Sequence, residues 1–287
     1  MAGQTARARM PGLDVLRGLA IALVLIRHAV PDLLGNGGIV GVVIFFTLSG
    51  YLITGLLVSE FDRTGRVSYG EFFRRRALRL YPPLLLLLAV YTVVELTTDR
   101  LHDRWYLGKT LVTALTYTSD LPLLPISPGL GHLWTLAIEE QFYLAWPFLL
   151  VFGLRRWRLS RMLVVIITTF WLTTVATVVI FNDDVGHLYK LPTSWAITLV
   201  IGAAARLFRD RLKAVLTRPR LLGGLGLVVC LLIAVGPEGK GSAMMYLVGG
   251  PVIGVATVLM INAATRWTSM PRLLVPLQIL GVISYAV

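Results

Sequence analysis

The chain has 287 residues, of which 56% are hydrophobic and only 15% are charged, and its mean hydropathy is +0.76. Soluble globular domains carry about 25% charged residues, so this composition argues against a soluble protein and for a polytopic membrane protein. The net charge of +12 would suit a nucleic-acid partner, but the placement of that charge along the chain argues against one.

Nine apolar segments follow one another along the chain, and each is a candidate for the roughly 20 residues that cross a bilayer as a helix. A shorter apolar piece, Leu107–Thr118, is expected to be a re-entrant or interfacial helix. The nine segments are Leu13–Val30, Ile39–Val58, Leu78–Leu96, His132–Gly153, Met162–Phe181, Leu191–Phe208, Leu221–Val235, Ala243–Ala263 and a last one that starts near Leu274 and stops at Val287.

This pattern predicts an all-α fold, a polytopic transmembrane helical bundle of about nine to ten helices whose last helix is truncated. We expect a single transmembrane domain over residues 1–287, incomplete at its C-terminus. No soluble domain, long linker or repeat interrupts the apolar segments.

Lysine and arginine gather in alternate loops between these segments, as they do on the cytoplasmic side of membrane proteins. The pattern predicts an integral plasma (inner) membrane protein with a cytoplasmic N-terminus. Anionic lipid or a cytosolic anionic ligand is the other partner that part of this charge would suit. The basic residues are Arg7, Arg9, Arg63, Arg66, Arg74, Arg75, Arg76, Arg79, Arg155, Arg156, Arg158, Arg161, Arg206, Arg209, Arg211, Lys213, Arg218, Arg220, Arg266 and Arg272.

The first apolar segment keeps the ionisable residues Arg17, Arg27 and His28, and Arg17 and His28 are eleven positions apart. In a helix they lie about 20° apart around the axis and about 16 Å apart along it, so they share one face. Imidazole is the usual general base near neutral pH, so His28 is a candidate catalyst and Arg17 a candidate anion contact. In the alternative interpretation, Arg17 reaches phospholipid head groups and His28 ends the helix. Arg27 points to a different face and a different partner.

The second and third segments each carry a polar candidate. Ser49 lies in GVVIFFTLSGYLIT, where Gly41 and Gly50 would allow close helix packing in lipid. Ser49 is either a nucleophile or a hydroxyl that bonds to a carbonyl one turn back. Arg76 and Arg79 share a helix face in FFRRRALRLYPP, and guanidinium pairs bind phosphate well. A plain positive-inside cluster is the alternative for the two arginines.

The stretch HLWTLAIEEQFYLAWP places two adjacent carboxylates, Glu139 and Glu140, in an apolar segment. His132 and Tyr143 share a helix face with Glu139. Glu139 is expected near the depth of His28, where a carboxylate could orient the imidazole as in a His–carboxylate dyad. A structural ion pair with Arg27 or another helix cation is the alternative.

Metal chemistry has no support in the sequence. His102 and His187 lie in outer loops without metal-ligand spacing to each other or to the other histidines. We expect both side chains to be solvated, and we expect neither a metal site nor a bound cofactor.

Taken together, the four stretches resemble the integral-membrane acyltransferase family 3, which includes bacterial O-antigen and peptidoglycan O-acetyltransferases. Arg17 and His28 match its Arg-x10-His motif, and GVVIFFTLSGYLI matches its second-helix motif. Arg76 and Arg79 match its Arg-x-x-Arg element, and HLWTLAIEEQFYLAWP matches its His-x-Trp-Ser-Leu-x-x-Glu-Glu-Gln-Phe-Tyr element with Thr135 in place of Ser.

Three features depart from the family pattern. The sixth helix often has an Arg and an Asp where this chain reads LPTSWAITLVIG. The usual Gly-Arg-Ile-Ser-Tyr reads Gly-Val-Ile-Ser-Tyr at residues 281–285, and the chain stops two residues later. We therefore expect a truncated product.

The resemblance implies acyl transfer from cytosolic acyl-CoA, most often acetyl-CoA, to a hydroxyl of a carbohydrate or related acceptor. Acyl-CoA is then a co-substrate, the partners are the acceptor and the bilayer, and nucleic acid is not a partner. Arg17, Arg76 and Arg79 would hold the CoA phosphates. His28 would be the general base or, alternatively, carry the acyl group itself.

The remaining candidates have supporting parts in this hypothesis. Glu139 and Glu140 would assist the catalytic imidazole, and the residues expected to contact the acceptor or support the site are Ser49, His132, Trp134 and Tyr143. A transporter or flippase of a glycan- or lipid-linked substrate is the alternative function, and a non-catalytic membrane scaffold is a third. The sequence leaves the acceptor, the acyl chain length and the oligomeric state open.

Overall fold

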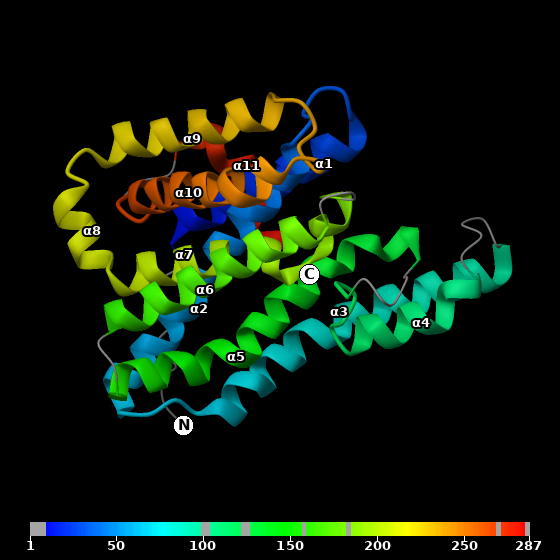
Figure 1. Cartoon of the computed structure of the whole chain (residues 1–287), viewed down its shortest axis with the longest axis horizontal. Coiled ribbons are helices and arrows are strands. Elements are labelled where there is room, and N and C mark those ends of the chain that lie inside the picture. The colour runs from blue at the N-terminus through cyan, green and yellow to red at the C-terminus, as the bar shows by residue number, and fades with distance from the viewer. Residues whose placement is uncertain are drawn as a thin grey trace.

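The computed structural model describes residues 10–98, 104–121, 127–156, 159–181, 185–267 and 271–284, with the side chains of residues 185–187 not described. Within these ranges the chain is almost entirely helical and contains no β-strand (Figure 1). The all-α prediction is therefore confirmed for the described part of the chain.

Eleven α-helices make up the described fold, and short helical turns connect some of them. The turns are η1 (Pro128–Leu133), η2 (Val185–Lys190), η3 (Met245–Gly249, of π type) and η4 (Arg272–Leu274). The helices are α1 (Pro11–Ala29), α2 (Gly37–Thr64), α3 (Tyr69–Thr98), α4 (Arg104–Leu115), α5 (Trp134–Arg156), α6 (Leu159–Ile180), α7 (Pro192–Leu207), α8 (Arg209–Val215), α9 (Pro219–Val235), α10 (Gly250–Ala264) and α11 (Val275–Ile283).

The predicted number of membrane-crossing helices was wrong, although each of the nine predicted segments overlaps a helix. By length and composition, four described helical stretches could cross a membrane: α2, α3, α6 and Met245–Ala264. A fifth is added if α7 and α8, bent by 78° relative to each other, count as one span. The helix α9 has only 17 residues, and α1 and α5 carry charged side chains within their apolar runs.

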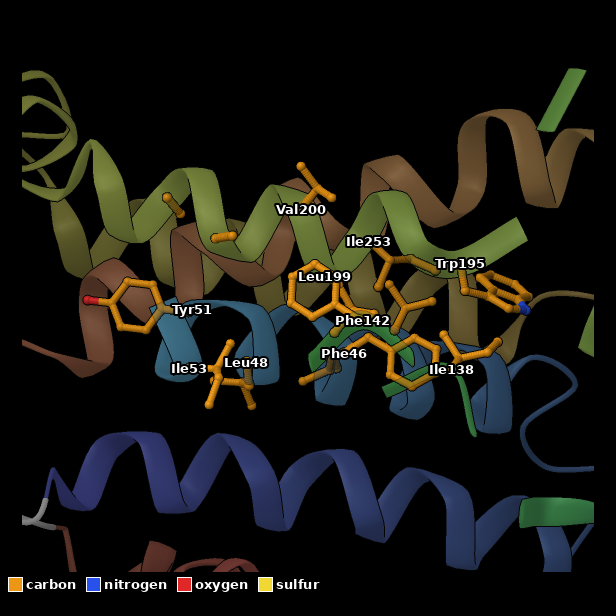
Figure 2. Close-up of a cluster of buried hydrophobic side chains, with 14 of the residues drawn as sticks. Phe46, Leu48, Tyr51, Ile53, Ile138, Phe142, Trp195, Leu199, Val200 and Ile253 are labelled. Carbon is orange, nitrogen blue, oxygen red and sulfur yellow. The ribbon is translucent and has the colours of Figure 1, made fainter. Parts of the chain in front are cut away.

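The helix α2 lies at the centre of the bundle, with 78% of its most apolar window buried. It packs most extensively on α7 and then on α1. Figure 2 shows part of the core around it, with Phe46 and Leu48 from α2, Phe142 from α5, Leu199 from α7 and Ile253 from α10. The core therefore forms between helices far apart in the sequence.

Glycine lets α2 and α7 approach closely. A β-carbon on Gly50 would lie 1.9 Å from the carbonyl oxygen of Leu199, and one on Gly202 would lie 1.9 Å from that of Thr47. Small residues at such crossings bring helix backbones together in lipid. The predicted packing role of Gly50 is thus confirmed.

The helices α3 and α6 present wide apolar faces to the outside. Only 17% and 11% of their most apolar windows are buried, and large side chains such as Leu86, Val93, Val164 and Val179 are 60–69% exposed. Soluble proteins rarely expose contiguous apolar area of this kind. These faces are suited to lipid, and the protein is a membrane protein.

The loops meet at two opposite ends of the bundle. At the basic end, Arg155 donates to the Gly65 carbonyl at 3.2 Å and Arg266 donates to the Lys213 carbonyl at 3.0 Å. At the other end, the Asn36 side chain donates to the Pro237 carbonyl at 2.6 Å. The basic loops thus gather on one side, while the predicted cytoplasmic location of that side stays a prediction.

Candidate functional site

A cavity of about 750 Å³ opens at the end of the bundle where α1 finishes. Its wall is built by the last turns of α1, the first half of α2, η1 with the start of α5, η2, and the loop after α9. Three predicted site residues, His28, His132 and Trp134, line this cavity together. Residues from distant parts of the sequence therefore surround one space large enough for a small molecule.

The His28 ring is held in one orientation by its own helix. Its Nδ1 lies 2.8 Å from the carbonyl oxygen of Val24, one turn earlier. Because a carbonyl oxygen only accepts hydrogen bonds, Nδ1 carries the hydrogen and the neutral ring keeps its lone pair on Nε2. The side chain is exposed at the cavity. This arrangement leaves Nε2 able to accept a proton.

His132 faces the same cavity from η1, outside the candidate membrane spans. Its backbone carbonyl accepts a hydrogen bond from the Thr135 hydroxyl at 2.9 Å, which fixes the junction between η1 and α5. Partial burial and the neighbouring His28 imidazole lower the pKa of His132 below its usual value. Burial and His28 therefore both favour the neutral form of the His132 imidazole.

An aromatic wall closes one side of the cavity and is formed by Phe46, Trp134 and Tyr189. The Trp134 ring centroid lies 4.9 Å from that of Tyr189 and 6.2 Å from that of Phe46, to which it is perpendicular. Trp134 is buried, with 4% of its surface exposed. The predicted acceptor-side residue Trp134 thus lies in the cavity wall.

One helical turn deeper along α2 and α5 lies the polar cluster, defined here as Ser49, Arg76, Glu139, Glu140 and Tyr143. The Tyr143 hydroxyl donates to Glu139 Oε1 at 3.4 Å, and the Ser49 hydroxyl is hydrogen-bonded to the same Tyr143 oxygen. Either hydroxyl could be the donor in the bond between Ser49 and Tyr143. The cluster joins α2 to α5 in the bundle interior.

Arg76 joins α3 to this cluster. Its Nη2 donates to Glu140 Oε1 at 2.8 Å, and its guanidinium carbon lies 3.4 Å from the centroid of the Tyr143 ring. The two partners of the ion pair are only 20% and 15% exposed. Arg76 Nε is buried and makes no hydrogen bond to any described residue, so one donor of the guanidinium is unused.

The other two predicted donor-binding arginines occupy different environments. Arg17 is buried on α1, with 9% of its surface exposed, and it acts electrostatically on Glu139 together with Arg76. Arg79 is exposed on α3, one turn from Arg76. The structure therefore associates Arg17 and Arg76 with the same carboxylate and leaves Arg79 at the surface.

His28 and Glu139 make separate contacts among the described residues. His28 bonds to Val24 and Glu139 to Tyr143, and Glu139 does not line the cavity. The alternative pairing of Glu139 with Arg27 is also absent here, because Arg27 donates to Glu238 Oε1 at 3.3 Å and to the Gly35 carbonyl at 3.1 Å. The partner of Arg27 is a loop carboxylate rather than one on a helix.

Sequence reasoning missed the charged residues at the cavity rim. Lys190 and Lys240 line the cavity, and Lys240 Nζ lies 3.4 Å from Glu238 Oε1. Lys190 ends η2 and Lys240 lies in the loop after α9, and neither belongs to a motif, so no pattern in the sequence pointed to them. Their place at the cavity follows only from the fold.

No group of three or more metal-binding side chains comes together in the part of the chain that the structure describes. His102 lies outside the described residues, and the side chain of His187 is not described. Arg7, Arg9, Arg158 and Tyr285 also lie outside the described residues.

Comparison with known proteins gives a consistent family. The profile of the acyltransferase domain Acyl_transf_3 matches residues 10–287. O-acetyltransferase OatA of Staphylococcus aureus (strain NCTC 8325 / PS 47) is 30% identical over 307 aligned positions, which cover 96% of this chain and 49% of the relative. Putative O-acetyltransferase SAS0844 of S. aureus (strain MSSA476) is 39% identical over 158 residues, which cover 50% of this chain and 25% of the relative.

The chain spans about half the length of the OatA relatives it matches, and no solved structure matches it. Because the family profile covers almost the whole chain and the matching motifs surround the cavity and the polar cluster, the protein belongs to the acyltransferase 3 family.

Proposed function

We propose that the protein is a membrane-bound O-acyltransferase that moves an acyl group, acetyl above all, from cytosolic acyl-CoA to a hydroxyl of a carbohydrate or related acceptor. Two relatives are O-acetyltransferases by name, and the chain belongs to an acyltransferase family. Acyl-CoA acts as a co-substrate in this proposal, with no resident cofactor. The N-terminus and the basic end are cytoplasmic.

The observation that carries the proposal is the contact between His28 and the Val24 carbonyl at the edge of the cavity. The 2.8 Å contact between Nδ1 and the Val24 carbonyl leaves a lone pair on Nε2 at a cavity of about 750 Å³. A positioned imidazole near neutral pH is the group best suited to take a proton from a hydroxyl. We therefore assign the general base to His28.

The acyl transfer then proceeds in two stages. The acceptor hydroxyl gives its proton to His28 Nε2 while its oxygen forms a bond to the thioester carbonyl carbon. Collapse of the tetrahedral intermediate breaks the carbon–sulfur bond, and the departing CoA sulfur takes the proton back from the imidazolium. In the alternative route, Nε2 attacks the thioester carbonyl carbon, the carbon–sulfur bond breaks and the CoA thiolate leaves. The acyl-histidine then passes the acyl group to the hydroxyl, whose proton goes to the released CoA sulfur.

Arginines of α1 and α3 would hold the donor in this scheme. Arg17 and His28 are eleven residues apart on one helix, which is about 16 Å along its axis, and an extended pantetheine arm has a similar reach of roughly 15–20 Å. The unused Nε donor of Arg76 supports a role in binding an anion, because buried donors rarely stay unpaired. Arg79 would extend the same contact to the surface.

Glu139 and Glu140 would act through the polar cluster. Glu140 holds the Arg76 guanidinium at 2.8 Å, so it sets the position of a donor-binding group. Glu139 accepts from Tyr143 and interacts electrostatically with Arg17. We propose that Glu139 assists His28 through the field that it creates below the cavity, with Ser49 and Tyr143 fixing its geometry.

Purified protein in liposomes with radiolabelled acetyl-CoA and cell-envelope glycans tests the proposal. Transfer of label to a glycan, with one free CoA thiol released per acetyl group, would support it. Movement of a glycan-linked substrate across the vesicle without CoA release would contradict it and favour a transporter. The absence of both acetyl transfer and substrate movement with every glycan tested would favour the non-catalytic scaffold.

A further inference from the structure

The rim of the His28 cavity carries more positive than negative charge. Arg27, Lys190 and Lys240 line the cavity, and no acidic side chain of the described residues lines it. One carboxylate, Glu238, does not line the cavity but contacts both Arg27 at 3.3 Å and Lys240 at 3.4 Å. The described groups at the rim thus leave two positive charges uncompensated.

Lys190 contributes most directly to this excess. It is exposed at the cavity and forms no ion pair or hydrogen bond with the residues that the structure describes. Lys240 is held with its ammonium 4.8 Å from the centroid of the Tyr189 ring, a favourable cation–π distance. Two ammonium groups that line one cavity are suitable contacts for an anionic group.

The aromatic wall lies next to these cations. Tyr189 contacts Trp134 on one side, at 4.9 Å between centroids, and Lys240 on the other. Flat aromatic side chains offer a large apolar contact surface with little loss of conformational freedom. A pyranose ring has one apolar face and would stack on such a wall while its substituents meet the charged rim.

We propose that the acceptor which enters this cavity is an anionic sugar, with its carboxylate or phosphate held by Lys190 and Lys240 and its ring against Tyr189 and Trp134. This inference rests on the proposed function, because it places the reacting hydroxyl of that sugar at His28. The phosphates of CoA would bind elsewhere, since the arginines assigned to CoA lie on other parts of α1 and α3. The rim would select the acceptor rather than the donor.

Binding can be measured without acyl-CoA, with the protein in nanodiscs of zwitterionic phosphatidylcholine. The probes are a galacturonic acid trisaccharide, its carboxyl-reduced counterpart, galactose 6-phosphate and galactose. We expect the acidic trisaccharide to bind at least about tenfold more tightly than the reduced one, with an affinity that falls as salt rises. Galactose 6-phosphate binding more tightly than galactose would show that phosphate serves as the anion as well.

Charge-changing variants give matched tests. Lys190→Gln and Lys240→Gln should each weaken binding of the acidic trisaccharide by about threefold or more and leave the reduced one unchanged. Glu238→Gln should strengthen binding of the acidic trisaccharide, since it removes the opposing charge. Lys109→Gln, at an exposed lysine of α4, is the control and should change nothing.

Equal affinity for acidic and reduced trisaccharides, no binding of any probe, or an equal effect of Lys109→Gln would overturn the inference. Failure of the proposed function looks different, because it is the absence of CoA release and acetyl transfer. Charge-dependent binding without acetyl transfer would keep the anionic site and reject the enzyme. Acetyl transfer to neutral and acidic sugars alike would keep the enzyme and reject the anionic site.

Discussion

Arg76 on α3 donates to Glu140 on α5 at 2.8 Å, and the pair lies mostly out of contact with solvent. The same guanidinium covers the Tyr143 ring, which in turn donates to Glu139. A single arginine therefore ties a helix with a wide lipid-facing surface to the interior of the bundle. Loss of either charge would leave its partner poorly solvated.

Glu140→Gln should lower the stability of the protein on the order of 3 kcal/mol, because removal of one member of a buried ion pair leaves the other charge uncompensated. Thermal unfolding in detergent measures this loss. The matched control is Arg74→Gln, which breaks an exposed pair with Glu71 on the same helix and should change stability little, because solvent screens exposed ion pairs. Equal losses for the two variants would show that the Arg76–Glu140 pair has no special role.

Tyr143→Phe should reduce acyl transfer while it lowers stability by roughly 1–3 kcal/mol, because the ring remains but the hydrogen bonds of its hydroxyl with Glu139 and Ser49 are lost. If Ser49 and Tyr143 act as one unit on Glu139, Ser49→Ala should add little to Tyr143→Phe. Initial rates of CoA release for the two single variants and the double variant measure this coupling. Ser59→Ala on the same helix removes a hydroxyl that donates to the Gly55 carbonyl at 2.6 Å, outside the polar cluster, and should leave the rate unchanged.

Gly50→Ala should destabilise the protein by about 3 kcal/mol or more, since the added carbon would lie 1.9 Å from a backbone carbonyl oxygen of α7. The yield of folded protein after detergent extraction and its melting temperature report the effect. Gly224→Ala is the control, because nothing lies within 4 Å of a β-carbon there. It should be neutral or stabilise α9 by up to about 1 kcal/mol. A well-folded Gly50→Ala variant would contradict the close packing of α2 on α7.

Cysteine labelling of intact cells tests the orientation. In a Cys230→Ala background, which removes the buried cysteine of the chain, Ser242→Cys and Thr217→Cys place single thiols at exposed positions of opposite ends. A membrane-impermeant maleimide should label residue 242 in intact cells and residue 217 only after permeabilisation. The reverse pattern would place the His28 cavity on the cytosolic side and reject the proposed topology.

The helices could be predicted from the sequence because long apolar runs leave little choice of secondary structure. The number of membrane spans could not be predicted in the same way. A charged residue such as Arg17 or Glu139 makes its helix more polar in sequence, whereas burial at a helix–helix contact decides where that residue lies. Local spacing correctly brought Glu139 and Tyr143 together on one helix face. The partner of Arg27 was beyond reach, since Glu238 lies 211 positions away in a short loop and carries no motif.

The same contrast holds for the site. His28, Arg76 and Glu140 were identified from motifs whose residues share helix faces, and the structure places each at the cavity or in the polar cluster. The contact expected between His28 and Glu139 rested on matching depths in the membrane, which fixes height but not the rotation of the helices. The catalytic roles of all these residues stay predictions.

Acyl-CoA-dependent acylation by membranes that contain His28→Ala, compared with wild type at equal protein level, is the decisive measurement. With His28 as the general base, the rate should fall by about 10²–10⁴-fold. His132→Ala should retain more activity, because His132 lines the cavity but is not assigned as the general base. A His28→Ala variant that acylates the acceptor at the wild-type rate would contradict the assignment of the catalytic base.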